Sequence, residues 1–291
     1  MNTRKYRWLA TLFISPAILL HAAVIFIPSL SSIYYSLTKW SGLDQPVFIG
    51  LENYRNIMHD PIVGQAFMHN LQWLLMAVTI PIVFGLGIAL LLKHIKAGQM
   101  FFRTSFFLPY VVSSVVIGRL FSIYYNPFGG INAIFKNMGL VALSKVDWLG
   151  DIKLALFSVF LADTWHWWGF VMVIMLSALH QVDEGLYEAA ELEGANAFQK
   201  LTCVTIPQIL PTLSTLITLI TIWTFLTFDY VFIMTGGGPA GGTEVLSTYI
   251  YRKTFVNYEA GYGAALSVIT SFVCVSIYFG FQRLQKKGWD I

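Results

Sequence analysis

Long apolar runs alternate with shorter polar stretches along the whole chain. A transmembrane helix needs about 20 predominantly apolar residues, and six runs reach that length. They lie at about 9–35, 67–92, 102–124, 153–179, 208–233 and 262–282. Several of these runs contain prolines, which membrane helices tolerate better than soluble helices do. The pattern predicts an all-α integral membrane protein, with residues 1–291 forming one six-span domain.

The composition excludes most soluble functions. Hydrophobic residues make up 56% of the 291 residues, charged residues only 11%, and the mean hydropathy is +0.66. Soluble domains carry about 25% charged residues. The net charge of +3, without a long Lys/Arg cluster, gives no basis for nucleic-acid binding. Cys203 and Cys274 stand alone, so the sequence predicts neither a disulfide framework nor a cysteine metal site.

The N-terminal apolar run is longer than a signal peptide requires. It extends from Trp8 to Tyr35, whereas the apolar part of a secretory signal usually covers about 7–15 residues. No clear small-residue cleavage site closes it. We therefore expect this run to be retained as the first span.

The distribution of Lys and Arg predicts the orientation of the spans, because short cytoplasmic loops are enriched in both residues. With the N-terminus inside, the inner residues are Arg4, Lys5, Arg7, Lys93, Lys96, Arg103, Lys200, Arg283, Lys286 and Lys287. The outer residues are Lys39, Arg55, Arg119, Lys136, Lys145, Lys153, Arg252 and Lys253. The inner loops are shorter, so their basic density is higher. Both termini are expected to be cytoplasmic.

A polar segment at 183–211 joins the fourth and fifth spans, where a short loop would suffice. Asp183 is a suitable N-cap, and Glu184 follows in the first turn, where the helix dipole favours an acid. Leu186 then lies on an apolar face of the expected helix. Gly194 is a suitable residue to end it.

A second short helix is expected directly afterwards. Asn196 and Gln199 have the spacing of a capping box. Phe198 and Leu201 would lie on one side of this helix, and Ile206-Pro207 should end it, because a residue before proline avoids the helical region. A helix pair lying on lipid would need a basic polar face, whereas residues 183–211 contain five acids and one lysine. Docking to a cytoplasmic protein fits better.

This segment resembles the EAA signature of permease subunits in binding-protein-dependent ABC importers. The matching residues are Glu188, Ala189, Ala190, Gly194, Ala195, Pro207 and Pro211. Glu193, Leu201 and Ile206 are conservative departures, since the family usually has Asp, often Phe, and usually Leu there. Further motifs that resemble this family are 48–54, 107–109, 126–132 and 148–151. The motifs at 228–230, 235–239 and 249–255 resemble its sugar-importer branch, and within it the larger maltose permease.

The resemblance implies a type I importer architecture in a bacterial or archaeal cell (inner) membrane. The implied partners are a second permease subunit, an ATPase dimer, an extracytoplasmic solute-binding protein and membrane lipid. The chain lacks the phosphate-binding pattern G-x-x-x-x-G-K-[ST]. We therefore expect ATP and Mg on a separate ATPase chain, no cofactor in this chain, and no enzymatic activity of its own. The resemblance assigns ATPase coupling to Glu188, Ala189, Ala190, Gly194, Ala195 and Pro207.

A substrate pathway is predicted around Asp163. Asp163 lies ten residues beyond Lys153, so about 15 Å into the membrane at 1.5 Å per residue. Charged groups at that depth are functional candidates. His166, Trp167 and Phe170 share a helix face with it by i, i+3, i+4, i+7 spacing. Trp223, Thr224 and Thr227 have the same geometry on the next span, and small-molecule sites combine such apolar surfaces with a few polar groups.

Other readings of these residues remain open. The aromatic residues could pack between helices, and Arg119 and Asp229 could snorkel or pair near outer helix ends. A metal site at Asp163 and His166 has no further His or Cys in support. Alternative functions are import of a glycerol phosphodiester or polyol, a secondary transporter, or a membrane enzyme using Asp163 and His166 as an acid–base pair.

Overall fold

The computed structural model describes residues 3–95 and 97–288. The backbone is helical over most of this length, as the apolar runs predict. Contacts divide it into two compact units. The first contains the residues up to Asp60 together with Ile250–Phe272, and the second contains Pro61–Tyr249 and the residues after Phe272.

The first unit combines helices with one small β-hairpin. Its first apolar run is continuous through three helical segments. Its elements are α1 (Thr3–His21), the π-helix η1 (Ala22–Phe26), α2 (Ile27–Ser36), β1 (Thr38–Lys39), β2 (Val47–Phe48), α3 (Glu52–His59), the π-helix η4 (Arg252–Val256) and the beginning of α14 (Ala260–Gly288). The two strands are antiparallel and pair Thr38 with Phe48 and Lys39 with Val47.

Asn53 holds the β-hairpin of this unit against the end of α2. Its side-chain amide is buried and donates hydrogen bonds to the backbone oxygens of Ser36 (2.9 Å) and Thr38 (2.8 Å). Buried carbonyls require such partners. The motif at residues 48–54 is therefore an ordered turn and helix, rather than a flexible loop.

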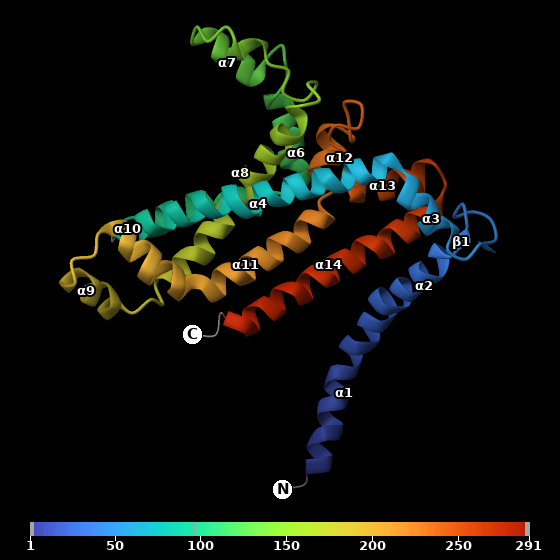
Figure 1. The fold of residues 1–291 in the computed structure, drawn as a ribbon, viewed down its shortest axis with the longest axis horizontal. Helices are drawn as coiled ribbons and strands as arrows, with labels where there is room; N and C mark the ends of the chain where they lie inside the picture. Colours follow the sequence, from blue (N-terminus) through green and yellow to red (C-terminus); the bar gives the residue numbers. More distant parts are fainter. Residues whose placement is uncertain (1–2, 96, 289–291) are drawn as a thin grey trace. The chain divides into compact units, whose positions relative to one another are not determined.

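The second unit contains most of the remaining helices, and Figure 1 shows their arrangement. Its elements are α4 (Pro61–Lys93), α5 (Gln99–Val111), α6 (Ser114–Tyr124), α7 (Gly130–Asn137), the 3₁₀ turn η2 (Leu143–Lys145), α8 (Ala155–Leu179), α9 (Glu184–Leu192), α10 (Ala197–Lys200), the π-helix η3 (Leu201–Thr205), α11 (Ile206–Leu226), α12 (Asp229–Met234) and most of α13 (Leu246–Tyr251). Helices α6 and α7 lie at one end of α8, and α9 and α10 lie at its other end.

The core of the second unit forms where α4, α8 and α11 pack together. Trp73 of α4 contacts Phe160 of α8 edge to face, with ring centroids 5.5 Å apart, and both side chains are at most 1% exposed. Gly169 allows α5 to approach α8, because a Cβ at this position would overlap the carbonyl oxygen of Phe106. Small residues permit this close approach of membrane helices.

Four of the six predicted spans are confirmed as long apolar helices. These segments are Leu12–Ser36, Pro61–Lys93, Ala155–Leu179 and Ala260–Arg283. The fifth predicted span falls within Ala197–Met234, which is also long and apolar enough to cross a membrane. In the described residues there are five such helices, or six if a bent pair counts as one.

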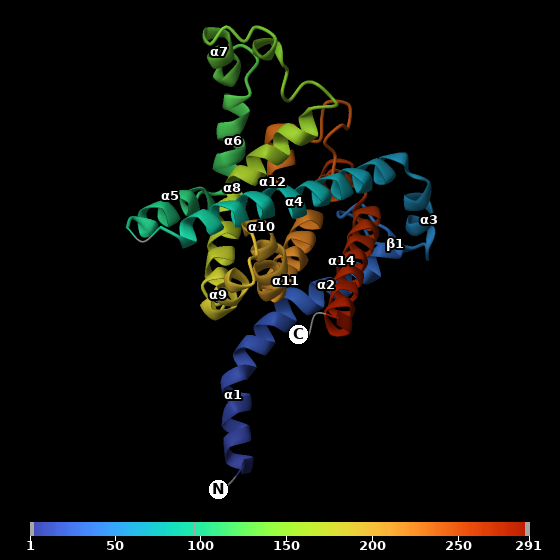
Figure 2. The ribbon, with the colours of Figure 1, turned by 60° about the vertical axis from the view of Figure 1, so that its left-hand side comes forward.

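The prediction of one continuous helix at 102–124 was wrong. Helices α5 and α6 meet at an angle of 91°, which is visible in Figure 2. Helix α5 continues through Pro109 to Val111, and the break follows at Val112, which is extended with φ −80° and ψ 140°. Irregular backbone is tolerated at membrane depth where it is buried in protein or lines a cavity, and this break borders the cavity described below.

The boundaries around the fifth span also differ from the prediction. Ile206-Pro207 does not end a helix, because the chain continues through η3 into α11 with Ile206 helical at φ −60° and ψ −47°. The wider π turn accommodates the proline, which would otherwise clash with the carbonyl four residues earlier. The same arrangement occurs where η1 precedes Ile27-Pro28. At the other end, Thr227 and Phe228 interrupt the predicted 208–233 helix between α11 and α12.

Candidate functional site

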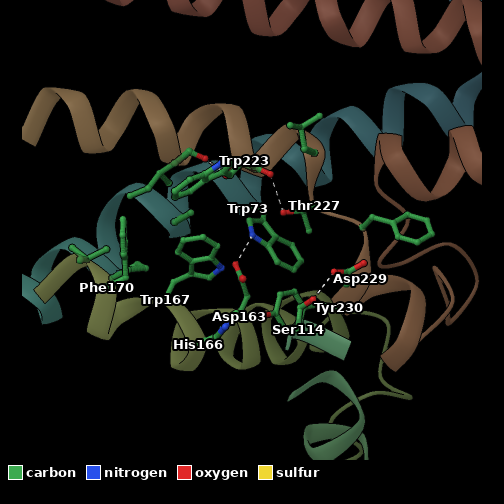
Figure 3. Close-up of a pocket in the computed structure, with 17 residues that line it drawn as sticks. Trp73, Ser114, Asp163, His166, Trp167, Phe170, Trp223, Thr227, Asp229 and Tyr230 are labelled. Carbon is green, nitrogen blue, oxygen red and sulfur yellow. Dashed lines mark hydrogen bonds between the residues drawn. The ribbon is translucent and has the colours of Figure 1, made fainter. Parts of the chain in front are cut away.

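The second unit contains a partly open cavity of about 300 Å³. That is the lower end of the size range of small-molecule sites. Helices α4, α8 and α11 form its walls, and the breaks before α6 and α12 border it (Figure 3). The residues that line it are Trp73, Ala77, Pro81, Ser114, Asp163, His166, Trp167, Phe170, Val171, Ile220, Trp223, Thr224, Leu226, Thr227, Phe228, Asp229 and Tyr230.

All seven residues predicted for the substrate pathway line this cavity. They are Asp163, His166, Trp167, Phe170, Trp223, Thr224 and Thr227. The helical spacing of α8 brings the first four to one face, and Trp223 of α11 lies across the cavity from them (Figure 3). Their roles in transport remain predictions.

Aromatic rings form much of the cavity wall. The rings of Trp167 and Trp223 lie 4.5 Å apart between centroids, at an interplanar angle of 36°. Phe170 meets Trp167 edge to face at 5.7 Å. These pairs fix the rings against one another, since such aromatic contacts are worth about 0.5–1.5 kcal/mol each. The cavity therefore has a preformed apolar surface that can pack against the C–H face of a solute.

Asp163 supplies a carboxylate at this aromatic surface. Its Oδ2 accepts a hydrogen bond from Nε1 of Trp73 at 3.2 Å. Figure 3 shows the carboxylate pointing from α8 toward Trp73, with Trp167 beside it. A carboxylate accepts several hydrogen bonds, so Asp163 can also accept from solute hydroxyls that enter the cavity.

His166 serves mainly to connect helices. Its Nε2 lies 3.2 Å from the carbonyl oxygen of Tyr110, and its Nδ1 lies 2.5 Å from the hydroxyl of Tyr230. A carbonyl oxygen can only accept, so Nε2 carries the proton and Nδ1 accepts from Tyr230. Both ring nitrogens are therefore occupied within the protein. His166 joins α8 to the broken end of α5 and to α12, which explains how the break in the third span is stabilised.

The second carboxylate of the cavity belongs to Asp229, which we expected near an outer helix end. Its Oδ2 accepts a hydrogen bond from Oγ of Ser114, so the first residues of α6 and α12 are joined. The lining contains two carboxylates and neither lysine nor arginine. A lining without a basic side chain offers an anionic solute no opposite charge.

Thr224 in α11 and Thr227 directly after it present mainly hydrogen-bond acceptors to the cavity. Thr224 Oγ1 donates to the carbonyl of Ile220 at 2.9 Å, and Thr227 Oγ1 donates to that of Trp223 at 3.3 Å. Each hydroxyl has one hydrogen, so its lone pairs remain for a solute. Thr224 is only 3% exposed, which leaves Thr227 as the more accessible of the two.

Sequence reasoning missed several lining residues. Trp73 was missed because its helix has apolar residues on all sides, so periodicity does not reveal which side faces the cavity. Ser114 and Tyr230 were missed because they reach the cavity only through the breaks before α6 and α12. Asn70 was the available signal on α4, since a buried amide requires hydrogen-bond partners, and it bonds to the carbonyl of Thr224 and the N–H of Leu246.

The polar segment after α8 forms the predicted helical hairpin of α9 and α10. Asp183 caps α9 by accepting a hydrogen bond from the N–H of Gly185 at 2.9 Å. Gly194 has φ +79°. The N–H groups of Gly194 and Ala195 bond to the carbonyls of Glu191 and Ala190, both at 2.9 Å. This pair of bonds is a Schellman motif, which explains the glycine.

The second half of the hairpin follows the predicted capping pattern. Asn196 and Gln199 form a reciprocal capping box, with bonds of 2.8 and 2.9 Å. Lys200 contacts Glu191 across the hairpin at 2.6 Å. Its ammonium donates a hydrogen bond to that carboxyl and so lowers the pKa of Glu191. Caps and ion pair together make the hairpin an ordered element.

The hairpin exposes apolar side chains at its tip. Leu192 is 91% exposed, Phe198 72% and Leu186 40%. Among the predicted coupling residues, Glu188, Ala189, Gly194 and Pro207 are exposed, and Ala190 and Ala195 are half-buried. The structure thus brings a small apolar surface together with the acidic side chains of α9. Such a combination is suited to contact with another protein.

No group of three His, Cys, Asp or Glu side chains is arranged to hold a metal ion in the described residues. Nδ1 and Nε2 of His166 are both engaged, as described above. The geometry therefore offers no support for the metal reading of Asp163 and His166.

The chain is similar to permease proteins over nearly its whole length. It is 32% identical to the lactose transport system permease protein LacF of Rhizobium radiobacter, covering 95% of this chain and 94% of that one. It is 28% identical to the trehalose/maltose transport system permease protein MalF of Thermococcus litoralis, covering 97% and 96%.

A solved structure has the same fold. It is a bacterial alginate ABC transporter in complex with an alginate pentasaccharide-bound periplasmic protein, with a TM-score of 0.85 at 19% identity. The match covers 98% of this chain and 96% of that one. This agreement supports the all-α membrane fold that the apolar runs predicted.

The family model for the binding-protein-dependent transport system inner membrane component matches residues 81–289. This match includes α8, the hairpin, α11 and most of the cavity lining. The chain is therefore a multi-pass transport component rather than an enzyme, and it belongs to the family of binding-protein-dependent transport system inner membrane components.

Proposed function

We propose that this chain is the permease subunit of an ABC importer that translocates a sugar or oligosaccharide delivered by an extracytoplasmic binding protein. The observation that carries the proposal is the aromatic cavity with its polar groups, held between helices whose far ends carry the hairpin. The names of the lactose and trehalose/maltose relatives support a saccharide.

The cavity chemistry suits an uncharged solute. Trp167, Trp223 and Phe170 offer ring surfaces, and Asp163 and Thr227 offer hydrogen-bond acceptors. Sugars present C–H faces and hydroxyl donors to such a surface. The absence of lysine and arginine from the lining argues against a glycerol phosphodiester, since phosphate is usually held by basic groups. A polyol has the same chemistry as a sugar and remains the alternative.

The hairpin is the proposed docking element for an ATPase subunit. Its exposed Leu192 and Phe198 would enter a cleft of that subunit, and Glu188 would contribute charge at the edge. ATP and Mg would be bound by the ATPase dimer, which would complete the transporter together with a second permease and the binding protein. Both termini and the hairpin would then be cytoplasmic, in agreement with the Lys/Arg distribution.

The test is to reconstitute the complete transporter in proteoliposomes and measure its ATPase activity. Lactose, maltose, trehalose, glycerol, sorbitol and glycerophosphodiesters would be added in turn, each with the binding protein. We expect stimulation by a neutral saccharide or polyol, and loss of that stimulation in Asp163→Asn. Stimulation by a phosphodiester alone would refute the neutral-solute assignment.

A further inference from the structure

Tyr187 connects the hairpin to two of the helices that line the cavity. It lies on α9, is half-buried, and packs against the core of the second unit. Nζ of Lys93, the last residue of α4, lies 4.3 Å from the centroid of its ring. Its hydroxyl lies 3.0 Å from Oγ1 of Thr205, in the π turn that leads into α11.

The direction of the Tyr187–Thr205 hydrogen bond follows from its neighbours. Oγ1 of Thr205 also bonds to the carbonyl oxygen of Lys200 at 3.2 Å. A carbonyl cannot donate, and threonine has one hydroxyl hydrogen. Thr205 therefore donates to Lys200, and Tyr187 donates to Thr205. Thr205 is 2% exposed, so water does not readily replace Tyr187 as its donor.

The contacts of Tyr187 involve two helices that line the cavity. Helix α4 carries Trp73 and α11 carries Trp223, and both side chains line the cavity (Figure 3). Tyr187 therefore contacts the end of α4 and the π turn that leads into α11. The π turn η3 is the adjoining irregular segment, and such turns are points where helices bend.

We propose that Tyr187 is a positioning residue that transmits movement of the hairpin to α4 through Lys93 and to α11 through Thr205. The inference rests on the proposed ATPase coupling and identifies the contacts within this chain that carry it to the cavity. Without these contacts the hairpin moves with the ATPase while the cavity-lining helices follow incompletely. ATP is then hydrolysed with less change at the cavity.

The test follows the accessibility of one cavity position in the complete transporter. Cys203 and Cys274 are replaced by serine and alanine, and Thr227→Cys is labelled with a membrane-impermeant maleimide in proteoliposomes. The labelling rate is measured with and without Mg-ATP and vanadate, and ATP hydrolysis is measured in parallel. This readout requires no knowledge of the transported solute.

We expect Tyr187→Phe, Thr205→Val and Lys93→Met each to reduce the nucleotide-dependent change in labelling by about threefold to tenfold. The ATPase subunits should still co-purify in normal amounts. Because Tyr187→Phe and Thr205→Val remove the same hydrogen bond, the double variant should be no worse than either single variant.

Thr202→Val is the matched control. Thr202 lies in the same π turn, but its hydroxyl donates to the carbonyl of Phe198 at 2.9 Å, within its own helix. Its nucleotide-dependent change should equal that of the unmodified chain. If Tyr187→Phe and Thr205→Val behave like Thr202→Val, the Tyr187–Thr205 hydrogen bond does not transmit the movement to α11.

A separate result tests the function on which the inference rests. The reference transporter carries Thr227→Cys and no change at Tyr187, Thr205 or Lys93. If its labelling rate does not change with nucleotide, coupling between the ATPase and this cavity is refuted. If that change is present and Tyr187→Phe and Lys93→Met both leave it intact, only the role of Tyr187 is refuted.

Discussion

Substitutions at Gly194 can distinguish the effect of backbone strain in the hairpin from the effect of charge on its surface. It occupies the left-handed region at φ +79°, and no atom lies within 4 Å of a Cβ added there. A side chain at this position therefore meets no steric obstacle within the chain. Its cost is backbone strain, about 1–2 kcal/mol for an ordinary L-residue and less for Asn or Asp, which visit this region more readily.

Asp and Asn at position 194 have nearly the same shape but differ in charge. The residues from Asp183 to Glu193 already include five acids. A further carboxylate in a desolvated protein interface costs several kcal/mol. With about 3 kcal/mol as a working value, the affinity for the ATPase should fall by about 100-fold, since 1.4 kcal/mol corresponds to a factor of ten. Gly194→Asn should lose no more than about tenfold.

The assay is ATP-driven uptake of the stimulating solute into proteoliposomes, with co-purification of the ATPase in mild detergent. We expect Gly194→Asp to abolish both while the protein remains in the membrane, and Gly194→Asn to retain both in part. Equal losses in the two variants would show that backbone strain is limiting, and retained uptake in Gly194→Asp would remove the docking hypothesis.

Three further predictions concern single positions. Glu188→Lys should reduce the amount of co-purified ATPase by about tenfold, and Glu188→Gln should reduce it much less because it adds no opposite charge. A normal amount of co-purified ATPase with Glu188→Lys would remove Glu188 from the docking surface. Trp167→Ala removes the ring that packs on Trp223 and should lower the kcat/KM of transport by about tenfold without loss of assembly; unchanged kinetics would leave Trp167 a packing residue. Gly169→Ala places a methyl group against the carbonyl of Phe106 and should destabilise the protein by about 1–3 kcal/mol, measured as a lower thermal unfolding midpoint in detergent; an unchanged midpoint would show that α5 can move away from α8.

Hydropathy and capping patterns predicted the parts of this fold that depend on local chemistry. Asp183, Gly194, Asn196 and Gln199 all have the predicted roles in the hairpin, because caps depend on residues only a few positions apart. The residues at i, i+3, i+4 and i+7 of α8 share one face as predicted, because a long regular helix preserves its periodicity, and this face lines the cavity.

The breaks in the helices could not be predicted in the same way. Pro109 and Pro207 both lie in apolar runs, yet the chain bends by 91° after the first and continues through a π turn at the second. The outcome depends on distant partners. His166 bonds to the carbonyl of Tyr110 beside the first break, and Thr205 in the π turn at the second bonds to the hydroxyl of Tyr187 on α9. Ser114 and Asp229 reach the cavity only because of such breaks.

Crosslinking from Ala189 tests the central claim most directly. Ala189 is exposed on α9, and the native Cys203 and Cys274 can be replaced so that Ala189→Cys is the sole thiol. The complex is then purified in mild detergent and the crosslinked chain is identified by mass spectrometry. The account predicts a crosslink to an ATPase that carries the G-x-x-x-x-G-K-[ST] motif, with a second permease in the same complex. Purification of this chain alone, with no such crosslink, would contradict it.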